Sequence, residues 1–184
     1  CSFICLFMIG LRGNFLPLYL EEQQFSASAI GVILAAGSLG QAAIRPFTSV
    51  VLRASGLVVT MMIAALIAIL GLSVVPLTGL QWLMAALVFI HGVGAGLHQS
   101  LGLVLLADNT SDDERGYAVG LRATINQVSS AGAPVLAGVL ADSFGMAPAF
   151  YLIGIALLLS TYWLWKVLSR ADAARKAANV QVTA

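Results

Sequence analysis

The residues that could do chemistry in this sequence are polar side chains set inside long apolar runs. Arg12 is the clearest case, because it lies near the middle of the first run, with Asn14 close by and Pro17 shortly after. An ionised side chain inside a bilayer is costly and usually points at a cavity or a partner. We expect Arg12 to line a path for a polar or anionic solute. The alternative is that it reaches to the membrane surface or pairs with a carboxylate on another segment.

The fourth apolar run holds a second group of polar residues. His91 and His98 are seven apart and Gln99 follows directly, so the two imidazoles share one helix face about two turns apart. Histidine can carry protons near neutral pH, whereas the alternative role is hydrogen-bonded packing. With residues from other runs they form the candidates for a solute path: Arg12, Asn14, Gln41, His91, His98, Gln99 and Asn126.

Charged residues near the ends of the runs suit other tasks. Arg45, Arg53 and Arg122 are expected to bind lipid headgroups or to hold loops at one membrane face. Asp142, at the far end of the fifth run, is expected to be a structural cap or gate rather than a proton carrier. Ser111 and Glu114 have the spacing of a capping box, in which each side chain bonds to the other residue's backbone N–H, so the fifth helix is expected to begin there.

The sequence carries no signature of an enzyme or of a metal centre. It has neither a GxSxG pattern for a nucleophilic serine nor a GxxxxGK[ST] phosphate loop. Cys1 and Cys5 lie four apart without a second pair or metal-ligand spacing, and we interpret them as membrane-facing or packing residues. We therefore expect no catalysis, no cofactor and no bound metal.

The composition indicates the environment of the chain. Hydrophobic residues make up 60% and charged residues only 9%, whereas an ordinary soluble domain has roughly 25% charged residues. Several apolar runs approach the about 20 residues that a helix needs to cross a bilayer. A net charge of +1 gives no reason to propose nucleic acid as a partner. The lipid bilayer and a small-molecule substrate are the partners to expect.

We predict an all-α membrane protein with a six-helix transmembrane domain over residues 1–168 and a tail over residues 169–184. Turn-forming residues separate the apolar runs and set the approximate ends of the helices. The six helices are expected at Phe3–Leu20, Ala29–Leu52, Leu57–Leu77, Trp82–Leu106, Tyr117–Leu140 and Ala149–Leu168.

The basic residues predict the orientation. Lysine and arginine occur after the sixth helix, between the second and third at Arg53, and between the fourth and fifth at Arg115. The other loops, residues 21–28, 78–81 and 143–148, contain neither. Because cytoplasmic loops retain positive residues, we predict a multi-pass protein of the cell (inner or plasma) membrane with both termini in the cytoplasm.

The passage from the fourth to the fifth helix carries the most specific motif. It runs from Ala107-Asp108 through Asp113-Glu114-Arg115-Gly116, and it ends in Gly138-Val139-Leu140-Ala141-Asp142-Ser143-Phe144-Gly145, a G-x-L-A-D-x-x-G pattern. This passage resembles the fourth-to-fifth or tenth-to-eleventh helix passage of the major facilitator superfamily. The resemblance covers nearly the whole chain and implies one six-helix half built from two three-helix repeats.

Two weaker motifs bear on which half this is. The segment Arg45–Gly56 is similar to the family's cytoplasmic loop motif in degenerate form, with Ser49 for its first glycine and Arg53 for its aspartate. With the basic tail and a fourth helix that lacks the arginine expected in the first half, this degeneracy favours the C-terminal half. The segment Gly132–Gly138 partly resembles the family's antiporter motif, with alanine at two glycine positions.

The resemblance implies secondary transport of a small solute by alternating access, with this chain as one wall of the site. It implies loop or gating roles for Arg45, Arg53, Gly56, Asp108, Arg115 and Arg122, and a helix-end motif at Pro134, Gly138, Asp142 and Gly145. Because the chain opens with Cys1 rather than methionine, we expect a fragment whose missing six-helix half is its partner. Two other hypotheses remain: a stand-alone six-helix protein that acts as a homodimer, and a non-transporting membrane receptor or scaffold.

Overall fold

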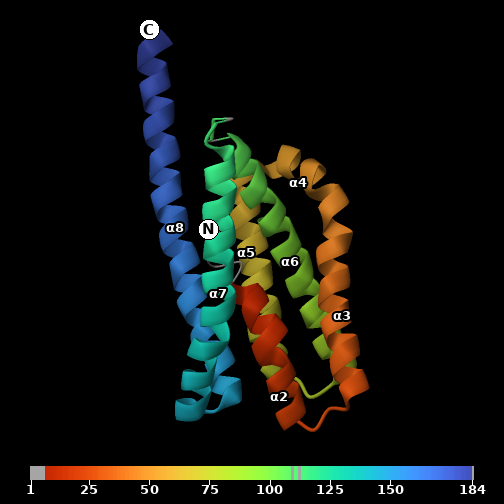
Figure 1. Cartoon of the computed structure of the whole chain (residues 1–184). Helices are drawn as coiled ribbons and strands as arrows, with labels where there is room; N and C mark the ends of the chain where they lie inside the picture. Colours follow the sequence, from red (N-terminus) through yellow and green to blue (C-terminus); the bar gives the residue numbers. More distant parts are fainter. Residues whose placement is uncertain (1–6, 109, 112, 184) are drawn as a thin grey trace.

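The structure is an all-α bundle of antiparallel helices (Figure 1), as the composition predicts. It is a computed structural model that describes the backbone of residues 7–108, 110–111 and 113–183, and the side chains of these residues except 108 and 167–183. No strand occurs within these ranges. The first helix, described over residues 7–22, contains the π-helical segment η1 (Leu11–Phe15) and α2 (Leu16–Glu22). The other elements are α3 (Ala27–Ile44), η2 (Arg45–Phe47), α4 (Thr48–Ser55), α5 (Leu57–Ser73), η3 (Val75–Leu77), α6 (Gln81–Asp108), α7 (Arg115–Phe144) and α8 (Met146–Thr183).

Most of these helices have the length and apolarity of membrane spans. In the described part of the chain, four segments meet both conditions: Ala27–Ser55, Leu57–Leu77, Gln81–Ala107 and Met146–Lys166. The described part of the first helix is shorter, and α7 is more polar, since Asn126 and Gln127 lie at its centre. Both run beside the four apolar helices in the bundle (Figure 1).

The turns between helices follow from a few residues. Gly56 and Gly145 have φ angles of 75° and 92°, which side chains other than glycine rarely adopt. Ser26 caps α3, because its hydroxyl accepts from the Ala29 N–H at 3.3 Å. The predicted capping box is wrong: Ser111 Oγ donates to Glu114 Oε2 at 3.0 Å, and α7 begins only after Glu114. The two side chains thus close the turn that precedes the helix rather than its first turn.

The second apolar run forms two helices rather than the single one expected over Ala29–Leu52. The α-helical geometry of α3 ends at Ile44, a 3-10 turn follows over Arg45–Phe47, and α4 continues to Ser55. Pro46 has no N–H for the carbonyl four residues earlier, so the α-helix cannot run through it unchanged. As a result α4 bends over the end of the bundle toward α5 (Figure 1).

Helix α6 lies between α3 and α5 and packs closely on both. Glycine makes this approach possible, because a Cβ on Gly92 would overlap the carbonyl oxygen of Gly37, and one on Gly94 would lie 2.6 Å from the carbonyl oxygen of Ala64. Small residues allow such contacts between membrane helices, where packing replaces the hydrophobic effect as the driving force. α8 then packs on α5 and α7, and α7 packs on η1, which completes the bundle.

The largest buried cluster lies at the α2 end of the bundle. The ring of Phe150 at the start of α8 contacts Phe15 at a centroid distance of 5.1 Å and Tyr19 at 5.4 Å, the latter edge to face. Aromatic pairs of this geometry add to the stabilisation from buried area. This cluster fixes the first helix against α8, so the position of Arg12 one turn away is also fixed.

Candidate functional site

The first helix widens at its polar centre. Arg12, Gly13 and Asn14 lie in the π-helical segment η1, where the N–H of Leu16 donates to the carbonyl of Leu11, five residues earlier. Pro17 follows directly and has no N–H to donate. The structure thus has a π-turn beside this proline, and π-turns in helices frequently mark functional sites.

Arg12 reaches from this turn into the contact between α3 and α6. A Cβ on Gly37 of α3 would lie 2.8 Å from Arg12 Nη1 and 2.9 Å from Val88 of α6. Gly37 therefore leaves the space that the guanidinium occupies. Nη1 is buried and has no hydrogen-bond partner. A buried polar atom without a partner is rare and calls for an explanation, such as a ligand or a water molecule.

His91 lies on the other side of this contact and is fully buried. Its Nδ1 donates to the carbonyl of Ala68 in α5 at 2.8 Å; because a carbonyl can only accept, the proton of the neutral ring sits on Nδ1. Nε2 is then an acceptor, and it is buried without a partner.

His98, two turns further along α6, also bonds to a backbone carbonyl of α5. Its Nδ1 donates to the carbonyl of Met61 in α5 at 3.2 Å, and the residue is 3% exposed. Both imidazoles thus turn toward α5, so the face that the sequence assigned to a solute path is also the packing face of α6. Their spacing predicted the shared face but not the neighbour, because the carbonyls lie 23 and 37 residues earlier in the chain.

Gln99 connects three segments near the Arg115 end of the bundle. Its side-chain oxygen accepts from Gln41 Nε2 at 3.0 Å and from Arg45 Nη2 at 3.2 Å. Its backbone carbonyl accepts from Arg122 Nη2 of α7 at 3.0 Å. The sequence predicted Gln41 and Gln99 as polar lining and Arg45 and Arg122 as loop residues, and the structure brings all four together. Since the bonded residues lie 23 to 58 positions apart along the chain, no sequence signal pairs them.

The remaining polar candidates lie apart from one another. Asn14 Nδ2 donates to the carbonyl of Gly10 at 3.1 Å, within its own helix. Asn126 of α7 is half-buried, and its Oδ1 is buried without a partner. The helix α7 that carries it packs closely against the first helix at Gly10, where a Cβ would lie 3.3 Å from the carbonyl oxygen of Ser130. Pro134 leaves this carbonyl without its usual helical partner.

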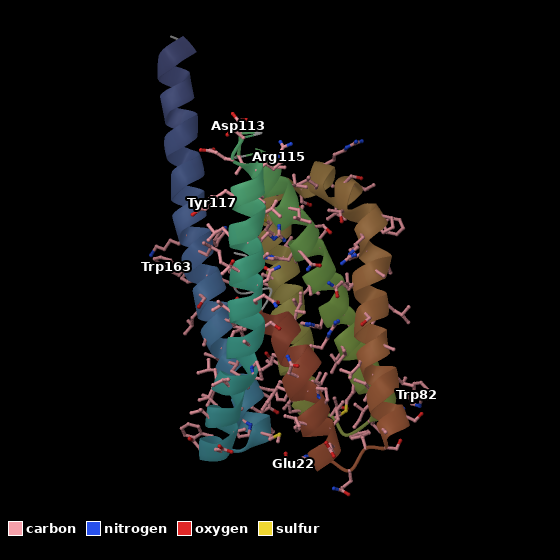
Figure 2. All side chains as sticks on the ribbon, viewed as in Figure 1. Glu22, Trp82, Asp113, Arg115, Tyr117 and Trp163 are labelled. Atoms are coloured by element: carbon pink, nitrogen blue, oxygen red, sulfur yellow. The ribbon has the colours of Figure 1, made fainter. Side chains whose placement is uncertain are left out.

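The motif residues occupy the two ends of the bundle. Arg53 and Gly56 lie at the α4–α5 turn, and Figure 2 shows Arg115 at this same end and Glu22 at the opposite one. Asp142 is exposed in the last turn of α7, where Gly145 ends the helix. A Cβ on Gly138 would meet no atom within 4 Å. The side chain of Asp108 lies outside the described residues.

Among the residues that the structure describes, no group of three His, Cys, Asp or Glu side chains could hold a metal ion. Arg12 Nη1, His91 Nε2 and Asn126 Oδ1 are buried polar atoms without a hydrogen-bond partner, and each lies on a different helix. Such atoms can orient a small polar molecule, whereas a metal would need several ligands around one point.

Comparisons with known proteins identify the family. The sequence profile of the Major Facilitator Superfamily matches residues 1–183. A multi-drug resistance efflux pump PmrA homolog of Lactococcus lactis is 26% identical over 151 residues, which are 80% of this chain and 37% of that protein. The vesicular acetylcholine transporter of Drosophila melanogaster is 23% identical over 168 residues, 91% of this chain and 29% of that protein. The chain thus spans about a third of the length of these relatives, and it belongs to the Major Facilitator Superfamily of membrane transporters.

Proposed function

We propose that this chain is one half of a secondary transporter and moves a small solute across the cell membrane by alternating access. The observation that carries the proposal is the partnerless Nη1 of Arg12, buried at a π-turn in the middle of the first helix. A guanidinium donates to carboxylate, phosphate or other polar oxygens. Arg12 would therefore bind the anionic or polar part of the solute, and Gln41, His91, His98, Gln99, Asn14 and Asn126 would supply further polar lining.

The other half of the site would come from a second six-helix unit. The relatives are about three times as long as the matched segment, and midplane sites in such transporters lie between two repeats that rock around them. The names of the relatives, an efflux pump and an acetylcholine transporter, support a small organic solute as cargo. The basic residues at one end of the bundle support an orientation with both termini in the cytoplasm.

The test is uptake into proteoliposomes that contain the natural gene product, with fluorescein as an organic anion and ethidium and acetylcholine as organic cations. We expect uptake of at least one probe, and a loss of about ten-fold or more in Arg12→Leu, because a charge-assisted hydrogen bond is removed. Arg12→Lys should keep part of the rate. Gly31→Ala is the matched control, since a Cβ there meets no atom within 4 Å. Wild-type uptake by a folded Arg12→Leu protein would contradict the site.

Two alternatives make different predictions in the same assay. A stand-alone six-helix protein would be active as a homodimer when the chain of 184 residues is reconstituted by itself. A receptor or scaffold would show no uptake of any probe, and its partner binding would depend on the loops near Arg53 and Arg115 rather than on Arg12.

A further inference from the structure

A hollow opens between α5 and α8, two helices that carry none of the residues proposed for the solute path. Its volume is about 220 Å³, and the lining residues are Met62, Leu66, Leu158, Thr161, Tyr162 and Trp165. The only hydroxyl on a buried side chain in this lining, that of Thr161, already donates to the carbonyl of Leu157 at 2.8 Å. The lining therefore suits an apolar ligand rather than a polar one.

One end of this hollow is aromatic and basic. The rings of Tyr162 and Trp165 pack at a centroid distance of 6.1 Å and an interplanar angle of 40°. Lys166 lies four residues after Tyr162, so it projects from the same helix face one turn further along. Residues 146–165 contain no charged side chain and Lys166 follows them directly, so the cation is expected at the level of a membrane surface. Tryptophan and tyrosine prefer this same level.

The hollow also lies near the end of the bundle that carries the other basic residues. It begins on α5 at Met62, one to two turns after the start of that helix at Leu57, and Arg53 precedes this start. Basic residues at a membrane surface attract anionic lipids. Among the described residues that line the hollow, none is acidic. Charge and shape thus both fit one kind of occupant, a lipid with an apolar chain and an anionic headgroup.

We propose that this hollow, together with Lys166, is a binding site for one anionic phospholipid, with an acyl chain between α5 and α8 and the headgroup phosphate at the Lys166 ammonium. The site is separate from the solute path around Arg12. A bound lipid would stabilise the packing of α5 against α8. Because α5 also packs on α6 and accepts the hydrogen bonds of its histidines, lipid composition would affect this contact as well.

Trp165 provides a reporter within the site. In a variant whose sole tryptophan is Trp165, fluorescence quenching is compared in vesicles of brominated phosphatidylglycerol and of brominated phosphatidylcholine. We expect an about five-fold preference for the anionic lipid, the effect of one basic residue near an anionic surface. Lys166→Gln should abolish the preference and Lys166→Arg should retain it. Arg45→Gln is the charge-matched control, because α3 and η2 do not lie beside α8.

A second reporter and a filled site complete the test. Trp163 is 68% exposed and points away from the bundle (Figure 2), so as sole tryptophan it should report bulk lipid and show no preference. Met62→Phe should fill the hollow and reduce the quenching of Trp165 without reducing that of Trp163. Equal quenching of Trp165 by both lipids, or a preference that survives Lys166→Gln, would overturn the proposal. So would a Trp165 that neither lipid quenches, because protein would then cover the hollow.

Discussion

One extra residue in the turn around Arg12 changes what this part of the first helix can contact. Across η1 the backbone hydrogen bond from Leu16 spans five residues, and the turn is wider than an α-helical turn. Arg12 packs on Gly37, whereas a Cβ on the next residue, Gly13, would meet no atom within 4 Å. One side of the turn is thus packed and the other is open, which is the geometry expected for the wall of a cavity.

A cysteine at position 13 tests whether that open side meets water. In a cysteine-free background, Gly13→Cys should react with a membrane-impermeant maleimide, because its side chain would face the solute path next to Arg12. Ile63→Cys on α5 is the control; Ile63 is 47% exposed and is expected to face lipid, where maleimide reacts poorly. If both cysteines stay unlabelled, Arg12 faces protein or lipid and has a structural role.

At the residue scale, the sequence predicted the depth of Arg12 but not the direction of the histidines. A charge in the middle of an apolar run is visible in the sequence, because burial costs so much free energy. The direction of a helical side chain depends on which neighbour packs on that face. His91 and His98 turn to carbonyls of α5, and no pattern within residues 81–108 indicates this.

The bond of His98 to α5 allows its two possible roles to be separated. If His98 holds α6 on α5, His98→Leu should lower the free energy of unfolding by about 0.6 kcal/mol and by no more than roughly 1.7 kcal/mol, the range for hydrogen bonds between membrane helices. Solute uptake per folded molecule should then stay near the wild-type rate. Unchanged stability together with lost uptake would instead assign His98 to the solute path. Thermal unfolding in detergent and the proteoliposome assay measure the two quantities.

At the scale of elements, α6 depends on glycine at its contacts with α3 and α5. Gly40 of α3 and Gly92 of α6 let the backbones of these two helices touch. Gly71 of α5 and Gly94 of α6 do the same for α5 and α6. The sequence shows the glycine-rich stretch Gly92–Gly96, and such stretches favour close packing of membrane helices. It could not indicate which helix each glycine would meet, because that depends on the order in which the helices are arranged in space.

Alanine substitution should separate contact glycines from free ones. Gly92→Ala would place a Cβ against the carbonyl oxygen of Gly37, so the two helices must separate, and we expect a loss of about 1–3 kcal/mol in unfolding free energy. Gly31 also lies in α3, but a Cβ there would meet no atom within 4 Å. Gly31→Ala should be neutral or stabilising by about 0.4–1 kcal/mol, because alanine has fewer unfolded conformations. Equal unfolding temperatures for the two variants would contradict the α3–α6 contact.

In the second apolar run, the sequence did not predict the break between α3 and α4. Residues 29–52 are apolar enough to be a single span, and the sequence predicts one helix over Ala29–Leu52. In the structure the α-helix ends before Pro46 and α4 bends toward α5. Whether a proline kinks a helix or ends it depends on what re-satisfies the freed carbonyl, and this is set by tertiary contacts.

At the scale of the whole molecule, large apolar side chains remain on the surface of α7. Val128, Val135 and Val139 are 63%, 67% and 59% exposed. A soluble monomer rarely exposes such a face over several turns, whereas a membrane protein can place it against lipid or against a second helical unit. The polar centre of the same helix, at Asn126, suits a face directed to a cavity. On the function proposed above, we propose α7 as one contact of this chain with a second six-helix unit.

The ends of the bundle differ in charge, and this difference predicts its orientation. Ser55 is the last residue of α4, at the same end of the bundle as Arg115 (Figures 1 and 2). Gly79 precedes Trp82 at the start of α6, which Figure 2 shows at the opposite end. Because basic loops stay in the cytoplasm, an impermeant maleimide should label Gly79→Cys on intact cells and Ser55→Cys only after permeabilisation. Both positions are exposed, so access alone cannot explain a difference. The reverse pattern would mean that segments outside this chain determine the topology, and labelling of both on intact cells would contradict a bundle that crosses the membrane between these turns.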